Sequence, residues 1–308
     1  MSKKTRPVNP LHCLIAITIS TFIIIVLILL FLLPGDHCNC PSNRTEYIIE
    51  KQVLTASTKT FDSAHNLAVL VPFRERFDEL LVFVPYMRKF LHDQHINHHI
   101  FVINQVDSYR FNRASLINIG YLYTKTDYDY VAMHDVDLLP LNKNLSYGYP
   151  HEQPFHVAAP HLHPRYHYAN FVGGILLINR DHFKLVNGMS NKYWGWGLED
   201  DEFFVRLRDA KLGVTRPTNI ATGINDTFKH IHPAHRKRDT AKCFNQRDVT
   251  RRRDRQTGLH DVNYRLIGVS SLTIDGEPVT IINVELICDR AVTPWCDCSA
   301  KAGNKNKT

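Results

Sequence analysis

The chain has 308 residues, of which 22% are charged and 44% are hydrophobic. This composition is typical of a folded protein and excludes a disordered or fibrous chain, and the length suits one large domain with appendages or two small ones. The formal net charge of +7 indicates an anionic partner, such as a nucleic acid, a membrane surface or a phosphorylated substrate, and does not choose among them.

An uncharged apolar run occupies residues 14–33. Twenty helical residues rise about 30 Å, the thickness of a bilayer's hydrocarbon core, whereas a cleaved signal peptide usually has only about 7–15 apolar residues. Lys3, Lys4 and Arg6 precede the run. The positive-inside rule therefore predicts a type II signal-anchor at 14–33, a cytoplasmic tail at 1–13 and a lumenal remainder; a buried core helix is the alternative.

A lumenal location predicts glycosylation and disulfide bonds. Sequons stand at Asn43, Asn144 and Asn225. Six of the seven cysteines follow the apolar run, in a compartment where disulfides form. We predict a bond between Cys288 and Cys296, which close a short loop. Spacing leaves the pairing of the other four open: Cys38, Cys40, Cys243 and Cys298.

The same location argues against a nucleic-acid partner. The basic run 251–255 is then interpreted as a solvated face, with an anionic-glycan contact as the alternative. Residues 34–65 are polar, contain proline and glycine, and lack apolar periodicity, which predicts a stem. A globular domain at 66–300 follows, and 301–308 form a polar tail.

Strands and helices are predicted to alternate in the first half of this domain. Apolar runs predict strands, and apolar residues at helical spacing predict helices, in the order strand 67–71, helix 77–92 with a kink at Pro85, strand 99–104, helix 113–124 and strand 130–134. Such alternation predicts an α/β layered domain with a largely parallel sheet. Ligands bind at the carboxyl ends of such strands, where the Pro72 turn and the Asp135–Asp137 pair stand.

Two short motifs have residue types that bind metals. Asp135-Val136-Asp137 brings two carboxylates two residues apart, and alternate residues of an extended chain point the same way. Hard cations take oxygen ligands, and a nucleotide diphosphate needs a cation, although a turn with exposed acids explains the motif equally well. His230-Ile231-His232 places two imidazoles on one side of an extended segment, where they suit Mn²⁺ or are simply a surface pair.

A third motif combines aromatic and acidic residues at 193–204. Trp194 and Trp196 alternate with glycines, and aromatic faces commonly stack on sugars. Glu199 and Asp200 then open a predicted helix, where the macrodipole stabilises acids and where a carboxylate can also act as a general base. The apolar positions of that helix fall at i, i+4 and i+7: Phe203, Leu207 and Ala210.

Together these features indicate a cation, a diphosphate, a sugar platform and a base, and over roughly residues 66–298 the chain resembles the β-1,4-galactosyltransferase family. The motifs that carry the resemblance are Pro72-Phe73-Arg74-Glu75-Arg76, Phe111-Asn112-Arg113-Ala114, Asp135-Val136-Asp137, Val172-Gly173-Gly174, Trp194-Gly195-Trp196-Gly197 and Glu199-Asp200-Asp201. His230-Ile231-His232 and the closing stretch 288–296 resemble the xylose-specific members.

The resemblance implies a GT-A glycosyltransferase fold in the Golgi lumen. It implies an inverting, Mn²⁺-dependent transfer of galactose from UDP-galactose to the 4-hydroxyl of xylose on proteoglycan core proteins, which forms the glycosaminoglycan linker. The metal ligands that it implies are Asp137, His230 and His232. Asp200 is the implied base, and Glu199 orients the donor or the acceptor.

The remaining implied residues divide between the two substrates. Those for the donor are Pro72, Phe73, Arg74, Arg76, Phe111, Arg113, Asp135, Val136, Gly173, Gly174 and Trp196, with Asp135 near the ribose and the glycines admitting the donor. Those for the acceptor are Tyr166, Tyr168, Trp196, Glu199 and Asp200.

Phe171 departs from the family pattern, in which a tyrosine precedes the Val-Gly-Gly run. The ring that would crowd an N-acetyl group remains, but the hydroxyl is missing, which weakens the choice of galactose over N-acetylgalactosamine. The alternatives are a sister β-1,4-galactosyl- or N-acetylgalactosaminyltransferase acting on N-acetylglucosamine, and a catalytically silent lectin or scaffold.

Overall fold

The computed structural model describes residues 19–26, 61, 64–233 and 236–299. The chain divides into two compact units, 1–54 and 55–308. Of the predicted anchor, only residues 19–26 are described, and they are helical. Among the described residues no helix is long and apolar enough to cross a membrane.

Several predicted features fall outside the described residues. They are the cytoplasmic tail, the stem apart from residues 61, 64 and 65, the polar tail 301–308, Asn43, Cys13, Cys38 and Cys40.

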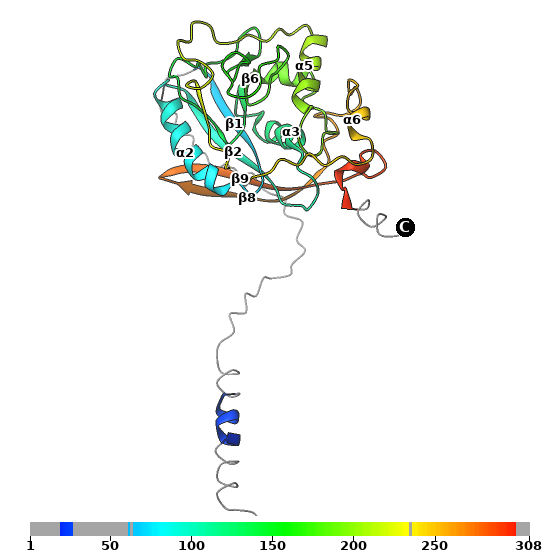
Figure 1. Cartoon of the computed structure of the whole chain (residues 1–308). Helices are drawn as coiled ribbons and strands as arrows, with labels where there is room; N and C mark the ends of the chain where they lie inside the picture. The colour runs from blue at the N-terminus through cyan, green and yellow to red at the C-terminus, as the bar shows by residue number, and fades with distance from the viewer. Residues whose placement is uncertain (1–18, 27–60, 62–63, 234–235, 300–308) are drawn as a thin grey trace, which may run out of the picture. The chain divides into compact units, whose positions relative to one another are not determined.

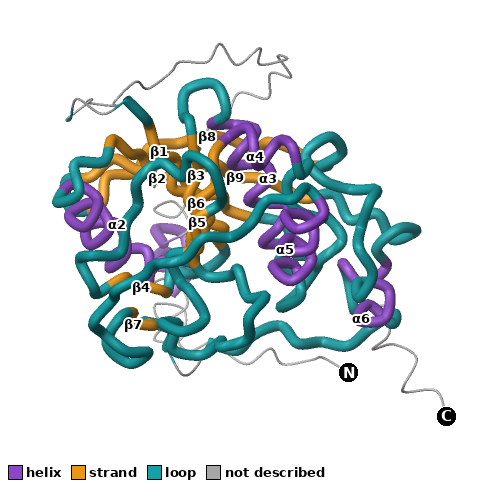
Figure 2. The backbone as a smooth tube through the Cα atoms, turned by 90° about the horizontal axis from the view of Figure 1, so that it is seen from above, coloured by secondary structure: helices purple, strands orange, loops and turns teal. Residues whose placement is uncertain are grey.

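The second unit is built on a seven-stranded sheet in the order β5-β6-β3-β1-β2-β9-β8 (Figures 1 and 2). Its strands are β1 (Asn66–Phe73), β2 (Asn97–Gln105), β3 (Tyr130–His134), β5 (Phe155–His156), β6 (Ile175–Asn179), β8 (Tyr264–Ile274) and β9 (Glu277–Leu286). A second, two-stranded sheet pairs β4 (Leu138–Pro140) with β7 (Phe228–His230).

The sheet is mixed, which corrects the expectation of a largely parallel one. The central strands β3, β1, β2 and β9 are parallel, whereas β6, β5 and β8 pair antiparallel with their neighbours. The β8–β9 hairpin turns at Asp275-Gly276, both at positive φ, as a tight two-residue hairpin requires. This hairpin lies in the second half of the domain, for which no strands were predicted from the sequence.

Six helical segments accompany the strands: α2 (Phe77–His92), α3 (Arg113–Thr124), α4 (Arg180–Leu185), α5 (Glu199–Asp209), α6 (Gln246–Val249) and the 3-10 turn η1 (Pro294–Cys296). The predicted helices 77–92 and 113–124 are present with the predicted bounds, and α2 continues through Pro85. Strand β1 likewise continues past the predicted stop at Pro72. The proline lies beyond the last pair with β3, so its missing N–H is not required on that side.

Alternate residues of β1 pack into two separate cores. Leu67 and Val69 face one core with α2, whereas Ala68 and Leu70 face the other with α3, α4 and α5. Because helices cover both faces, the central strands are continuously apolar.

Phe61, the first described residue of the second unit, is hydrogen-bonded to the sheet. The Asn97 side chain accepts from Phe61 N at 3.2 Å and donates to Phe61 O at 3.1 Å. The Phe61 ring lies edge-on to His92 and His95, with centroids 5.0 and 4.9 Å apart. Asn97 itself is buried, so both of its amide groups have a partner.

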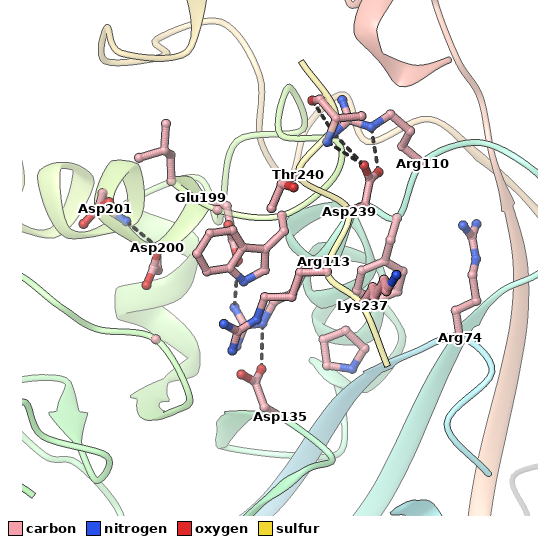
Figure 3. Close-up of a pocket in the computed structure, with 18 of the residues that line it drawn as sticks. Arg74, Arg110, Arg113, Asp135, Glu199, Asp200, Asp201, Lys237, Asp239 and Thr240 are labelled. Carbon is pink, nitrogen blue, oxygen red and sulfur yellow. Dashed lines mark hydrogen bonds and ion pairs between the residues drawn. The ribbon is translucent and has the colours of Figure 1, made fainter. Parts of the chain in front are cut away.

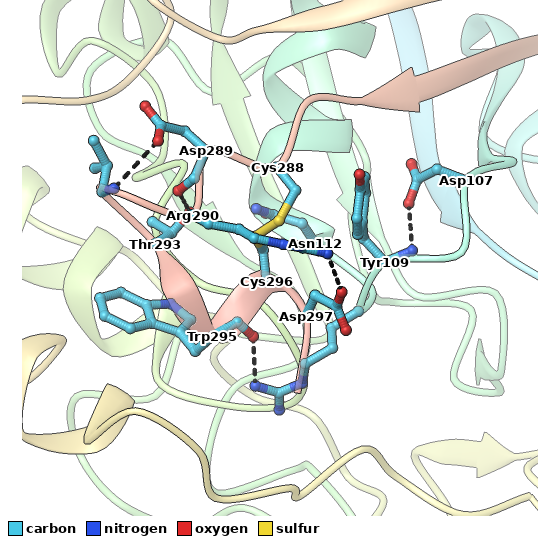
Figure 4. The surroundings of a disulfide bond; sticks show 12 residues. Asp107, Tyr109, Asn112, Cys288, Asp289, Arg290, Thr293, Trp295, Cys296 and Asp297 are labelled. Atoms are coloured by element: carbon cyan, nitrogen blue, oxygen red, sulfur yellow. Dashed lines mark hydrogen bonds and ion pairs between the residues drawn. A yellow bond between two sulfur atoms is a disulfide. The ribbon is translucent and has the colours of Figure 1, made fainter. Parts of the chain in front are cut away.

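Two disulfides fasten the C-terminal segment. Cys288 is bonded to Cys296, the pair expected from the sequence (Figure 4), and Cys243 is bonded to Cys298. The segment is also tied to Arg110, which donates from its backbone to Cys296 O at 3.0 Å. The closing stretch of the chain therefore supports a residue that reaches the cavity described next.

Candidate active site

A cavity of about 1320 Å³ opens at the carboxyl ends of β1 and β3 (Figure 3). Most of the residues implied by the family resemblance line it: Pro72, Arg74, Arg76, Phe111, Arg113, Asp135, Val136, Asp137, Tyr166, Tyr168, Gly173, Gly174, Trp196, Glu199, Asp200, His230 and His232. Phe73 does not line it. Its ring packs into the core with α2, because residues of β1 alternate between the two faces of the sheet.

The small β4–β7 sheet brings Asp137 next to both histidines. Leu138 pairs with His230, and Ile231 N donates to Asp137 O at 2.8 Å. In consequence His232 Nδ1 lies 3.0 Å, and His230 Nε2 3.7 Å, from the same oxygen, Asp137 Oδ2. Strand pairing thus brings together Asp137 and His230, which are 93 positions apart in the sequence. Asp135 takes no part in these pairs with the histidines.

These distances suit a divalent cation. Two ligand atoms about 2.1 Å from one ion and at right angles to each other are about 3 Å apart. His232 Nε2 lies 2.8 Å from Arg236 O, a carbonyl that only accepts, so a metal held at Nδ1 would leave Nε2–H to donate to that carbonyl. Among the described residues no three His, Cys, Asp or Glu side chains already have the arrangement of a metal centre. The set of one carboxylate and two imidazoles nevertheless fits Mn²⁺. Arg76 lies next to this set, with its Nη1 3.5 Å from His232 Nδ1.

Arg113 connects the two acidic motifs. Its Nε donates to Asp135 Oδ1 at 2.8 Å, and its Nη1 lies 4.0 Å from Glu199 Oε1. The side chain is held at the start of α3, where Asn112 caps the helix by accepting from Ser115 N. Asp135 is therefore paired with a cation that the protein supplies, which separates its role from that of Asp137.

Burial and like charges perturb the acids at the start of α5. Burial raises the pKa of Asp200 to about 8, and the carboxylates of Glu199 and Asp201 add to the effect. Burial also raises the pKa of Glu199, against the opposing effect of Arg113. The residue before the helix, Leu198, has a φ of 75°, an unusual value for a side chain of that size. A carboxyl group with a pKa near neutrality in a cavity can accept a proton during a reaction.

Gly173 and Gly174 are required by the protein's own side chains. A Cβ at Gly173 would lie 2.6 Å from Asp200 Oδ2 and 2.7 Å from the Phe171 ring. Gly174 has a φ of 74°, and a Cβ there would lie 2.9 Å from Leu138 Cδ2. The expectation that these glycines admit the donor is thus supplemented by a second reason. Because they have no side chains, Gly173 and Gly174 allow Asp200 and Leu138 of β4 to approach the turn that the two glycines form.

Aromatic side chains form the wall beside Asp200. Phe171 packs against the rings of His163, Tyr166 and Tyr168, with centroids 5.1, 5.1 and 5.5 Å away. The Tyr166 hydroxyl and Glu199 Oε2 are both buried, and neither has a hydrogen-bond partner among the described residues. Buried polar atoms normally have partners, so these two are free to bind ligand hydroxyls.

Trp196 also lines the cavity. Its side chain is 51% exposed, in contrast to the buried Trp194. Trp196 N donates to Asp239 O at 2.8 Å, and the Arg238 guanidinium lies 4.9 Å from the Trp196 ring and 5.8 Å from the Tyr166 ring. A flat, exposed indole beside unpaired hydroxyl-binding atoms has the features of a sugar platform.

Arg74 is committed to the protein itself. Its guanidinium donates to the carbonyls of Tyr109 at 2.6 Å, Asp107 at 2.9 Å and Gln105 at 3.3 Å. Arg74 lines the cavity, but most of its donors already have acceptors. The structure therefore assigns it to holding the 105–109 loop, and with it Phe111, rather than to direct ligand binding.

The segment 236–250 forms much of one cavity wall and was not predicted from the sequence. The segment is held in place by ion pairs with residues that are distant in the sequence. Arg236 Nε lies 3.2 Å from Glu79 Oε1, and Arg110 Nε donates to Asp239 Oδ2 at 2.7 Å. Proximity to His230-Ile231-His232 and an excess of basic residues were the only available signals, because the segment lacks apolar periodicity.

The basic run 251–255 is only partly a solvated face. Arg253 donates to Glu202 at 2.9 Å and lies 3.3 Å from Asp209, and Asp254 is buried against Ser190. Three arginines of the run are exposed: Arg251, Arg252 and Arg255. The sequons at Asn144 and Asn225 lie at exposed asparagines.

Comparisons with known proteins agree with this site. A family model described as the N-terminal region of glycosyl transferase group 7 matches residues 45–150, and one described as the N-terminal domain of galactosyltransferase matches residues 153–232. Drosophila melanogaster β-1,4-galactosyltransferase 7 is 65% identical over 242 residues, 78% of this chain and 75% of the relative. The Caenorhabditis elegans xylosylprotein 4-beta-galactosyltransferase is 50% identical over 239 residues, 76% of this chain and 83% of the relative.

A solved structure has the same fold. It is a Drosophila β-1,4-galactosyltransferase 7 mutant in complex with manganese, UDP-Gal and xylobiose, and it superposes with a TM-score of 0.75 at 65% identity, over 76% of this chain and 100% of that chain. The mixed sheet is therefore the GT-A-like sheet of the galactosyltransferase structures. With these two matched models and these identities, the chain belongs to the β-1,4-galactosyltransferase family.

Proposed function

We propose that this protein transfers galactose from UDP-galactose to the 4-hydroxyl of xylose on a protein, with inversion at the anomeric carbon and with Mn²⁺ as cofactor. The observation that carries the proposal is the position of Asp200. Its carboxylate has a raised pKa and lies between the aromatic wall of Tyr166 and the turn at Gly173, within one cavity with the Asp137–His230–His232 group. A relative named β-1,4-galactosyltransferase 7 is 65% identical to this chain, and one named xylosylprotein 4-beta-galactosyltransferase is 50% identical.

Asp200 would be the general base of the reaction. It would take the proton of the acceptor 4-hydroxyl while that oxygen bonds to the anomeric carbon of galactose, and the bond from that carbon to the UDP oxygen would break. A positioned base contributes about 10²–10⁴-fold to the rate. The raised pKa suits this role, because a base works best with a pKa near the operating pH.

The remaining residues would bind and orient the two substrates. Glu199 Oε2 and the Tyr166 hydroxyl, which are buried and unpartnered, would accept from or donate to sugar hydroxyls. Trp196 would present its exposed ring to a sugar face. Asp137, His230 and His232 would hold Mn²⁺, which as a Lewis acid neutralises negative charge on the diphosphate when bound.

The test is a parallel acceptor assay. The fragment 61–308 would be given labelled UDP-galactose and Mn²⁺ with either a β-xyloside or a β-N-acetylglucosaminide. We expect transfer to xylose alone. Transfer to N-acetylglucosamine alone would contradict the acceptor assignment, and UDP-N-acetylgalactosamine as a competing donor would show whether Phe171 in place of tyrosine relaxes the choice of donor.

We further propose that the protein is a single-pass type II protein of the Golgi membrane, with its catalytic domain in the lumen. The apolar run 14–33 after Lys3, Lys4 and Arg6 supports this topology. The disulfides Cys288–Cys296 and Cys243–Cys298 suit an oxidising compartment. In sealed microsomes, the domain should resist added protease and should shift in mass on treatment with an endoglycosidase; digestion of the domain without detergent would contradict this topology.

A further inference from the structure

The cavity wall formed by residues 236–247 has more positive charge than the protein itself neutralises. The segment contains five basic residues and one acidic residue, Asp239. Arg110 pairs with Asp239, and Arg236 pairs with Glu79. By contrast, Lys242 and Arg247 are exposed and have no ion pair within the described parts of the chain, and Arg238 has only its ring contacts.

These cations lie beside the tryptophan loop. Gln246, the neighbour of Arg247, donates to Trp194 O at 2.6 Å. At the other end of the segment, Asp239 O accepts from Trp196 N, and Arg238 lies over the Trp196 and Tyr166 rings. We call Arg238, Lys242 and Arg247 the basic wall. Arg238 contacts the rings of Trp196 and Tyr166, which would hold the acceptor, and its charge also reaches His230.

The cavity is larger than a small-molecule site. Its volume of about 1320 Å³ exceeds the range of roughly 300–1,000 Å³ that is usual for such sites. The negative charge of a donor diphosphate would be met by the divalent cation and by Arg76 beside His232. Part of the cavity volume and the positive charge of the basic wall are therefore left over for a second, anionic part of the substrate.

We propose that the basic wall binds an acidic peptide, namely carboxylate-bearing residues that flank the xylosylated residue of the acceptor. This inference rests on the proposed function, because the acceptor there is a single sugar attached to a protein. A xylose at Trp196 leaves the peptide one sugar's length away, so residues next to the glycosylated position meet the wall. A polyanionic glycan is less suited, because no glycan precedes the first sugar.

The experiment compares three acceptors with the fragment 61–308, UDP-galactose and Mn²⁺. Two are O-xylosylated peptides of equal length that differ only in having glutamate or glutamine around the xylosylated residue, and the third is a simple β-xyloside. At low ionic strength we expect kcat/KM for the glutamate peptide to exceed that for the glutamine peptide by about three- to tenfold, as for two exposed ion pairs. The ratio should approach one at 0.5 M salt.

Variants identify the residues responsible. In the double variant Lys242→Gln/Arg247→Gln, which leaves only Arg238 of the basic wall, the ratio should fall towards one. In a matched control, Lys184→Gln/Arg251→Gln, two exposed cations that do not line the cavity are removed, and the ratio should stay at the wild-type value.

Each other outcome would overturn the inference. A wild-type ratio of one, with good transfer to the simple xyloside, would refute the basic wall and leave the proposed function standing, whereas no transfer to any xyloside would refute the proposed function. Equal losses on both peptides in the double variant, together with weaker UDP binding by calorimetry, would assign these cations to the donor. Competition by heparin oligosaccharides but not by the free glutamate peptide would assign them to a glycan.

Discussion

Replacing Gly173 with alanine tests whether the position of Asp200 limits turnover. The added Cβ would lie 2.6 Å from Asp200 Oδ2 and 2.7 Å from Cε2 of Phe171, whereas unstrained contacts of carbon begin at about 3.5 Å. Phe171 is enclosed by the rings of four neighbours, so the carboxylate, which projects into the cavity, is the group that moves, by about 1 Å. A displacement of about 1 Å in a catalytic group can cost about 10²-fold in rate.

The assay is transfer from UDP-galactose to a β-xyloside. We expect kcat of Gly173→Ala to fall by about 10²-fold, while binding of UDP, which lacks the donor's sugar, changes little by calorimetry. The added methyl group should lower the melting temperature by a few degrees, since overpacking costs about 1–3 kcal/mol.

A matched control is available at Gly223. A Cβ at Gly223 meets no atom within 4 Å, and its φ lies outside the left-handed region, so Gly223→Ala should behave as the wild type. If Gly173→Ala turned over within threefold of wild type, the reasoning would fail, because the carboxylate would then not need the place that the structure gives it.

Further variants test the remaining parts of the site and the fold. Asp200→Asn should lower kcat by at least about 10²-fold with UDP binding nearly intact, and weak UDP binding with normal turnover would contradict its role as base. Because the pKa of Asp200 is raised to about 8, its basic form accumulates as pH rises; kcat/KM of the wild type should rise over that range, and a flat profile would count against this assignment. His232→Gln should raise the Mn²⁺ concentration for half-maximal activity at least about tenfold, measured by titration after treatment with a chelator. Cys243→Ser should lower the free energy of unfolding by about 4 kcal/mol and Cys288→Ser by about 2.5, because the closed loops span 55 and 8 residues; denaturant curves in the reverse order would refute this ranking.

Local patterns were sufficient to predict the elements that hold the site. The central strands are buried on both faces and therefore read as apolar runs, and α3 and α5 show helical spacing next to the motifs. The order β3-β1-β2 places Asp135 and Pro72 at one sheet edge, as ligand binding at the carboxyl ends of strands predicts.

Contacts between distant residues could not be predicted in this way. Arg74 belongs to a motif associated with nucleotide binding, yet the fold places three backbone carbonyls within reach of its guanidinium. The bond between Cys243 and Cys298 depends on how the 236–250 segment returns to the end of the chain. The same holds for Lys242 and Arg247, whose charge is visible in the sequence but whose place on the cavity wall depends on ties to Arg110 and Trp194.

Under the proposed membrane topology, the attachment of Phe61 to Asn97 has a consequence for release of the enzyme. Both backbone groups of Phe61 and its ring are bound by residues of the sheet unit, so Phe61 is held firmly to that unit. A single cut by a secretory-pathway protease before residue 61 would leave every contact of the cavity untouched. We therefore expect a form released by such a cut to keep full specific activity, whereas a cut that removes Phe61 would expose the buried amide of Asn97 to water.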